Sequence, residues 1–209
     1  ENSIQIINGS KYDMYNGGLY EDGMLIKYNA EREEEWRKEI KGGGIIINSV
    51  AQTMDDGYIV GGDFTSKSID LENGISLTNN GYHAGMIIKC NAEGTVEWAN
   101  AIGEHYESID SVIETSGGDY IAIGYFKALQ IKLGNDIVLN NNCWNGDSDT
   151  YENGMFLRYT SKGEIDYAKT IGGEYSCVIN DIIKTKDNNY VLIGDSSSEI
   201  NLGDGESLS

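Results

Sequence analysis

Two histidines, His83 and His105, are the only imidazole side chains in the 209-residue sequence. Histidine is the commonest general acid or base near neutral pH, so these residues are the first candidates for chemistry. Each is predicted in a loop, His83 directly before a strand and His105 directly after one. Neither belongs to a readable Ser/His/Asp or Cys/His arrangement, and the 34 acidic residues single out no acid–base pair. The sequence therefore nominates no catalytic residue.

A polar loop over residues 140–152 is the segment best suited to binding a ligand. Binding residues concentrate on loops, and tryptophan is enriched at binding hot spots. We therefore predict ligand contacts from Trp144, Asn145 and Tyr151, stacking on a sugar or clamping a peptide. The alternative is a loop that folds back on the structure, with Trp144 covering an apolar rim.

The same loop carries three carboxylates, Asp147, Asp149 and Glu152. Oxygen-rich clusters suit Ca²⁺, so these three are the candidate metal ligands, and Ca²⁺ is the one cofactor considered. Their spacing lacks the twelve-residue order of an EF-hand loop. A solvated acidic loop without a metal is the alternative.

The three cysteines, Cys90, Cys143 and Cys177, form neither a metal-ligand pattern nor an even-numbered disulfide framework. Cys90 occupies a strand position that Tyr28 and Tyr159 hold elsewhere, so we expect a buried, inert thiol. Cys143 and Cys177 can pair only if the loop reaches the next repeat.

The composition excludes several classes of partner. The formal charge is −19, which argues against nucleic acids and anionic membranes because both attract basic surfaces. No segment approaches the roughly 18 apolar residues that span a bilayer, and the N-terminus carries no signal-peptide pattern. We expect a soluble chain, or the mature part of something longer.

A threefold repeat of about 65 residues organises the chain. A glycine-led apolar segment occurs at residues 23–29, 85–91 and 154–160. An aromatic residue follows thirteen positions after each leading glycine, as Trp36, Trp98 and Tyr167. Two further strand-like segments complete each repeat, at residues 48–53 and 57–62, 110–115 and 119–124, and 180–185 and 189–194.

Each repeat predicts four short strands, with a small polar hairpin between repeats at residues 69–77, 131–139 and 200–202. Residues 4–6 match that hairpin. The best helical candidate, residues 30–41, is charged along its length and aligns with a strand, so we expect no helix.

Four strands per repeat predict an all-β fold of β-propeller-type blades, with a β-solenoid as the alternative. We treat residues 1–209 as a single repeat domain with units at 23–84, 85–153 and 154–209, and with residues 1–22 completing the hairpin of the last or a missing blade. Ile59, Ile121 and Val191 are expected to fill the layers between blades. The Trp36, Trp98 and Tyr167 series is expected to form one equivalent packing layer per blade.

The glycine-led segments and the strands before them resemble a known repeat family. Residues 62–66 (Gly-Asp-Phe-Thr-Ser) followed by residues 85–94 (Gly-Met-Ile-Ile-Lys-Cys-Asn-Ala-Glu-Gly) are similar to the bacterial SBBP-type β-propeller repeat. Residues 154–163 fit the same pattern, with Arg158 in place of lysine. The resemblance implies a propeller architecture and a secreted or cell-surface bacterial protein, without implying a reaction.

We therefore expect a non-catalytic module that serves as an interaction or adhesion scaffold for a protein or glycan. The alternative is a fragment of a carbohydrate-active propeller enzyme that uses carboxylates. Three blades are fewer than the typical minimum of about four for a closed propeller. Either further blades of a longer chain complete the ring, or a homodimer closes a six-bladed ring.

Overall fold

The computed structural model describes residues 3–13, 18–103, 105–142, 151–202 and 207–208. These residues form strands, turns and loops with no helix, which confirms the predicted all-β class. The helical candidate at residues 30–41 contains strand β3 (Glu34–Ile40), and its counterparts in the other repeats contain β9 (Val96–Ile102) and β15 (Ile165–Ile171).

Four antiparallel sheets, numbered here in chain order, contain the longer strands. Sheet 1 consists of β1 (Ser3–Asp13), β2 (Gly18–Tyr28) and β3. Sheet 2 consists of β4 (Ile45–Gln52), β5 (Tyr58–Phe64), β8 (Ala84–Cys90) and β9. Sheet 3 consists of β10 (Glu107–Glu114), β11 (Tyr120–Phe126), β14 (Asn153–Tyr159) and β15. Sheet 4 consists of β16 (Cys177–Lys184) and β17 (Tyr190–Ser196).

Small hairpins form at the predicted residues, but the first two lie between the second and third strands of a sheet, whereas the prediction placed them between repeats. The first joins β6 (Ser68–Asp70) to β7 (Ser76–Thr78), and the second joins β12 (Gln130–Lys132) to β13 (Val138–Asn140). A shorter third pair joins β18 (Ile200–Asn201) to β19 (Ser207–Leu208).

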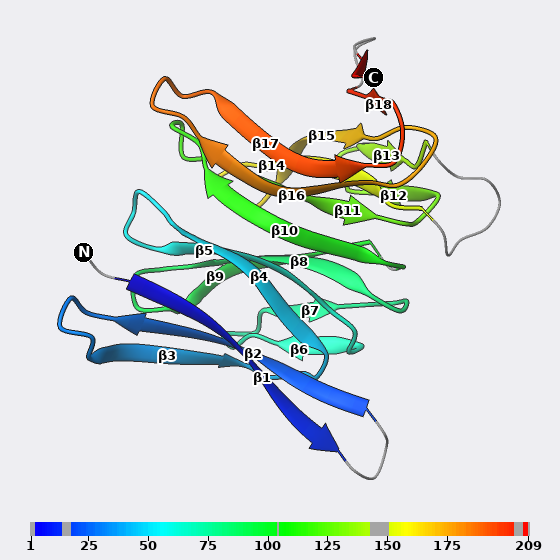
Figure 1. Cartoon of the computed structure of the whole chain (residues 1–209). Helices are drawn as coiled ribbons and strands as arrows, with labels where there is room; N and C mark the ends of the chain where they lie inside the picture. The colour runs from blue at the N-terminus through cyan, green and yellow to red at the C-terminus, as the bar shows by residue number, and fades with distance from the viewer. Residues whose placement is uncertain (1–2, 14–17, 104, 143–150, 203–206, 209) are drawn as a thin grey trace.

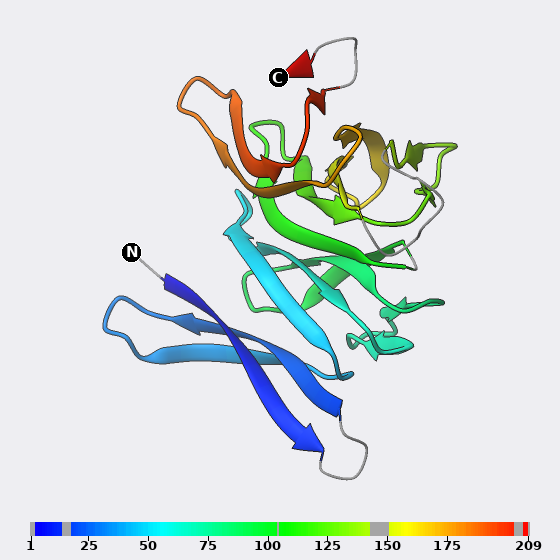
Figure 2. The same cartoon turned by 45° about the vertical axis from the view of Figure 1, so that its right-hand side comes forward.

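The sheets stack face to face in chain order, from sheet 1 at one end to sheet 4 at the other (Figures 1 and 2). The first strands of successive sheets, β4, β10 and β16, contact one another along the stack. The described residues form no closed ring. We call the contact between sheets 2 and 3 the 2–3 junction, and that between sheets 3 and 4 the 3–4 junction.

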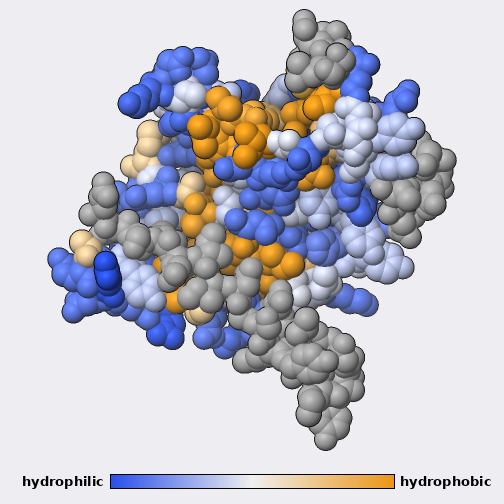
Figure 3. Space-filling model, viewed as in Figure 1, coloured by the Kyte–Doolittle hydropathy of each residue, from blue (hydrophilic) through white to orange (hydrophobic). Residues whose placement is uncertain are grey.

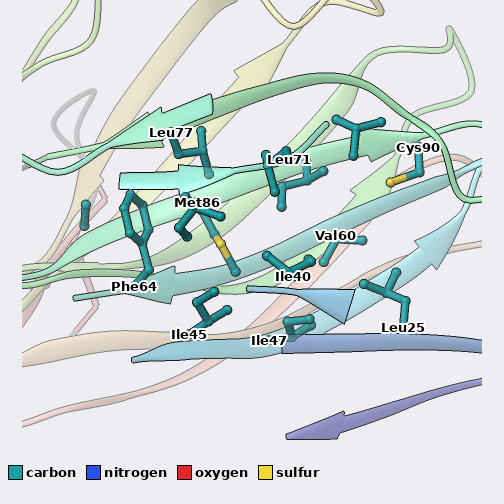
Figure 4. Close-up of a cluster of buried hydrophobic side chains, with 14 residues drawn as sticks. Leu25, Ile40, Ile45, Ile47, Val60, Phe64, Leu71, Leu77, Met86 and Cys90 are labelled. Atoms are coloured by element: carbon teal, nitrogen blue, oxygen red, sulfur yellow. The ribbon is translucent and has the colours of Figure 1, made fainter. Parts of the chain in front are cut away.

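Buried aliphatic side chains fill the space between sheets. Figure 4 shows the layer in which residues of sheet 1 meet residues of sheet 2 and the first hairpin, including Leu25, Ile40, Ile47, Val60 and Leu77. A second layer lies at the 2–3 junction and a third at the 3–4 junction. Because both faces of the inner sheets are covered, every residue of β5 and β8 is buried, as expected of strands packed on two sides.

The predicted aromatic layer is present at the first two positions of the series. Trp36 Nε1 donates to the carbonyl of Ala92 in sheet 2 at 3.1 Å, and Trp98 Nε1 donates to Ser161 in sheet 3 at 3.3 Å. The turn beneath Trp98 needs glycine, because Gly163 has φ +81° and an added Cβ would lie 2.6 Å from the indole. Each tryptophan therefore caps a turn of the next sheet.

The third position of the series differs. Tyr167 is 43% exposed, because sheet 4 has two described long strands and no turn there to cover it. Ile59 and Ile121 are buried as predicted, whereas Val191 is 48% exposed on the outer face of sheet 4, with Ile193 at 60%. Figure 3 shows hydrophobic residues at the surface over β16 and β17.

Two features differ from the sequence-based expectation. Each complete sheet takes two strands from one predicted unit and two from the next, so the units at 23–84, 85–153 and 154–209 do not coincide with sheets. Residues 4–6 belong to β1 instead of a hairpin, and Ile4 pairs with Lys27. Strand β1 lies beside β2 as β5 lies beside β8 in sheet 2 and as β11 lies beside β14 in sheet 3. The backbone groups along this edge of β2 are therefore paired.

Candidate functional site

Strand register brings both histidines to one end of the 2–3 junction. Phe64 pairs with Ala84, so the end of β5 lies beside the start of β8, where His83 precedes the strand. Gly85 pairs with Ile102, which places the end of β9 and the following His105 at the same end. The sheet 3 strand β10 begins there with Glu107. Residues far apart in the sequence therefore meet at one site.

His83 forms an ion pair with a buried carboxylate of β5. His83 Nε2 lies 2.9 Å from Asp63 Oδ1, and the two side chains are 18% and 5% exposed. This close contact with Asp63 raises the pKa of His83, and the charge of Glu107 adds to the effect against the opposing cost of burial. Asn48 and Ser108 donate to the other carboxylate oxygen, at 3.3 and 3.1 Å.

Glu107 is fully buried at the start of β10. Burial raises its pKa to about 7, although backbone N–H groups, including that of His105 at 2.8 Å, favour the ionised form. Its Oε1 atom has no hydrogen-bond partner among the described residues. Gly103, at φ +73°, makes room for it, because an added Cβ would lie 2.2 Å from the carboxyl group.

A third carboxyl group, Asp110, lies on β10 at the bulge between Ile109 and Ser111. Burial raises its pKa to about 6, and the charge of Asp63 adds to the effect. Ser108 Oγ lies 2.6 Å from Asp110 and 3.1 Å from Asp63. The hydroxyl has one proton to donate, so a protonated Asp110 completes the hydrogen-bond chain through Ser108 to Asp63.

Aromatic rings lie beside this ionisable cluster. The rings of Tyr82 and Tyr106 are nearly parallel, with centroids 6.4 Å apart, and His105 lies 6.0 Å from Tyr82. Tyr82 is 73% exposed and Tyr106 is 39% exposed. Lys127 Nζ lies 5.5 Å from the centre of the Tyr106 ring. The arrangement presents flat aromatic surface to solvent directly above buried charges.

A groove of about 700 Å³ adjoins Tyr82 and His105 between the two hairpins. Its described lining combines hydroxyl, amide and small apolar groups and contains no acidic side chain, although the chain as a whole is acidic: Thr78, Asn80, Gly81, Tyr82, Ala101, Gly103, His105, Ala128, Gln130, Ile131 and Lys132. Such a surface suits a ligand that offers hydroxyl groups and ring faces.

The 3–4 junction carries an aromatic pair at corresponding positions. The Tyr151 and Tyr175 rings meet edge to face at 5.6 Å. Glu152 stands where His83 stands in the preceding repeat, and it pairs with Lys127 at 3.0 Å and accepts a hydrogen bond from Ser176. Burial alone would raise the pKa of Glu152, but these two partners hold it below its ordinary value.

The predicted binding loop is described only in part. Trp144, Asn145, Asp147 and Asp149 lie outside the described residues, as does Cys143. Tyr151 contacts Tyr175, and Glu152 is engaged by Lys127 and Ser176. Among the described residues, no group of three His, Cys, Asp or Glu side chains is arranged to hold a metal ion. The calcium ligands therefore stay a prediction.

The cysteines in the described region are buried free thiols. Burial raises the pKa of Cys90 to about 11, in agreement with the predicted inert thiol. Burial also raises the pKa of Cys177.

Sequence reasoning missed Tyr82, Tyr106 and the buried carboxyl groups. One signal was present: a tyrosine stands three positions before each repeat-leading glycine, as Tyr20, Tyr82 and Tyr151. The recurrence makes Tyr82 the counterpart of Tyr151, which was predicted to bind ligand. Glu107 carried no signal, because its burial follows from tertiary packing.

No family model and no curated protein matches this chain. The described residues contain no helix long and apolar enough to cross a membrane.

Proposed function

We propose that the protein is a non-catalytic binding module whose ligand is a glycan held in the groove beside Tyr82. The observation that carries this proposal is the exposed Tyr82 ring, which lines a groove with no acidic side chain in its described lining and lies nearly parallel to the neighbouring Tyr106. A tyrosine ring offers a rigid apolar face with a polar tip, which matches the alternation of C–H and hydroxyl groups on a sugar ring.

The polar groups that line the groove favour a sugar over an apolar molecule as its ligand. Asn80 and Gln130 bring amide groups to the lining, where Gln130 Nε2 donates to Asn140 at 2.9 Å, and Thr78 supplies a hydroxyl. Lys132 and His105 add donors. These groups pair with sugar hydroxyls in either direction.

The burial of the carboxyl groups supports a module without catalytic activity. Asp63 is 4% exposed and Glu107 is fully buried. A glycosidase needs two carboxyl groups that reach the scissile bond from either side. Carboxyl groups enclosed between sheets instead serve to organise the surface above them.

For the architecture, we propose propeller-type blades in a secreted or cell-surface bacterial protein. The repeated sheets with first strands in contact and the resemblance to SBBP-type repeats support this assignment. Ca²⁺ bound by the loop over residues 147–152 is a further part of the proposal.

The exposed apolar side chains on the outer face of sheet 4 support the proposal that this face binds a partner. Val191 and Ile193 correspond to Ile121 and Ile123 of sheet 3, which are 2% and 0% exposed beneath sheet 4. Exposed apolar patches of this kind mark interaction surfaces. We propose that further blades, or a second copy of the chain in a six-bladed ring, cover this face.

A glycan microarray probed with the labelled full chain tests the binding function. Tyr82→Ala is expected to weaken binding to the retained glycans about tenfold, which is what one lost aromatic contact of about 1.4 kcal/mol produces. Tyr167→Ala is the matched control, because Tyr167 is also an exposed tyrosine but lies away from the groove. Equal binding by Tyr82→Ala and the unchanged chain would overturn the proposal.

A further inference from the structure

The loop that carries Tyr82 is fastened on both sides of the tyrosine, by the buried Asn79, whose N–H donates to the Lys67 carbonyl, and by His83. Tyr82 contributes ring contacts at the surface, whereas His83 reaches inward to Asp63 of β5 at 2.9 Å. The His83 ring also lies 6.1 Å from Tyr106. On the opposite side, Tyr106 directly precedes the buried Glu107. Each exposed tyrosine is therefore adjacent in the chain to a buried ionisable residue.

The charge balance beneath the tyrosines depends on protons. When Glu107 and Asp110 are protonated, the cluster reduces to one balanced pair, His83 with Asp63. When both lose their protons, His83 faces the buried carboxylates of Asp63 and Glu107, and the partly buried Asp110 adds a third negative charge beside Asp63 through Ser108. Charges enclosed without partners are costly, so the second state favours opening of the junction at this end.

The other ionisable groups around His83 lie on several elements. His105 and Tyr106 contribute from the loop before β10, and Tyr125 from β11, where burial raises its pKa to about 12. Lys127 lies over Tyr106 and pairs with Glu152, so its charge is already balanced. Glu104 lies outside the described residues. None of the described neighbours replaces His83 as the cation that faces Asp63.

We infer that the proton occupancy of His83, Glu107 and Asp110 controls whether the Tyr82 loop is held against the 2–3 junction, so that the groove binds its ligand more tightly in mildly acidic than in mildly alkaline solution. This inference rests on the proposed function, because it concerns the same groove. The direction of the shifts supports it: the pKa of His83 is raised by its contact with Asp63, and burial places the pKa values of Glu107 and Asp110 at about 7 and about 6.

Aromatic NMR spectra of the full chain between pH 5 and 9 test the inference without any ligand. The Tyr82 ring resonances are expected to follow the titration of His83, with a midpoint above the ordinary histidine value of about 6.5. Amide exchange in residues 79–83 is expected to become about tenfold faster above the midpoint, after correction for the intrinsic pH dependence of exchange. Tyr175 is the internal control and is expected to stay unchanged, since its junction carries the Glu152–Lys127 pair instead.

Two variants complete the test. Asp63→Asn is expected to lower the His83 midpoint and to move the Tyr82 transition with it. Glu107→Gln keeps the shape of the side chain and is expected to reduce the Tyr82 change while His83 still titrates. A Tyr82 ring that does not follow His83, or a Tyr175 ring that moves equally, would overturn the inference. The array result is independent, so a failure of glycan binding is distinguishable from a failure of the pH response.

Discussion

The 2–3 and 3–4 junctions occupy equivalent places in the repeat but carry different chemistry. At the 2–3 junction, His83 pairs with Asp63, and Glu107 is buried beside them. At the 3–4 junction, Glu152 replaces His83 and pairs with Lys127. Both junctions keep an aromatic contact at the surface, Tyr82 with His105 and Tyr151 with Tyr175.

The difference separates what the repeat needs from what one junction adds. The strand pairing, the apolar layer and the surface aromatic pair recur, so they belong to the scaffold or to a repeated binding surface. The buried ionisable cluster does not recur, because Cys177 takes the place of Glu107 and Tyr125 that of Asp63. What distinguishes the 2–3 junction is therefore its ionisable cluster beside the groove.

Removing one partner from each ion pair is expected to give the largest difference between the two junctions in the loss of unfolding free energy. Asp63→Ala leaves His83, Ser108 and Asn48 without their shared acceptor, and breaking a buried pair in this way costs about 3 kcal/mol. Glu152→Ala breaks a partly exposed pair and is expected to cost about 1 kcal/mol. Urea unfolding at pH 6 measures both changes. Equal losses would contradict the distinction between the junctions.

The dependence of stability on pH is expected to come mainly from the 2–3 junction. The folded-state pKa of Glu107, at about 7, lies above the ordinary value, so the folded chain retains a proton that the unfolded chain releases. Stability therefore falls as pH rises from about 4.5 to 7, by about 3 kcal/mol for this group. His83 acts in the same direction, since its pKa is also raised and its contribution is lost at high pH.

Urea unfolding at pH 5 and pH 8 measures this slope, and Glu107→Gln is expected to remove part of it, the rest coming from His83 and from Asp110, whose pKa burial raises to about 6. Glu152→Gln is the matched control at the 3–4 junction and is expected to leave the slope unchanged. At the acid end, the hydrogen bond from Thr53 holds the pKa of Asp55 at about 2. Its contribution is lost as pH falls below about 4. A chain that is most stable at pH 8 would contradict this account of Glu107.

The smallest effect on folding is expected at the open face of sheet 4. Ile193→Lys is expected to change the free energy of unfolding by at most about 0.5 kcal/mol, because the side chain is 60% exposed. The same substitution is expected to abolish any self-association seen by light scattering. Association of the unchanged chain is expected to tighten as salt screens its charge of −19. A monomer insensitive to salt at micromolar concentration would show that this face needs no partner.

The sequence predicted those features that recur. The three glycine-led segments lie in β2, β8 and β14, the hairpins lie at their expected positions, and Trp36 and Trp98 pack between sheets. Recurrence made these features visible, because each was seen more than once. The sequence did not show which four consecutive strands share a sheet, since a repeat of four strands can be divided at any strand.

The candidate site was beyond sequence reasoning for a different reason. Asp63 and His83 are brought together by the register of β5 against β8, which depends on the hairpin between them. Glu107 is one of 34 acidic residues, and its burial depends on the packing of sheet 3 against sheet 2. Both histidines were interpreted as loop residues, which is correct for their place in the chain but omits their contacts.

Titration calorimetry with the glycan that the array retains best tests the central claim most directly. The full chain is expected to bind that glycan more tightly at pH 5.5 than at pH 8, by about tenfold if one charge-assisted contact holds the Tyr82 loop. Tyr82→Ala is expected to weaken binding at both pH values, and Tyr175→Ala to leave the pH dependence intact. Equal affinity at the two pH values, with Tyr82→Ala binding as well as the unchanged chain, would contradict the account.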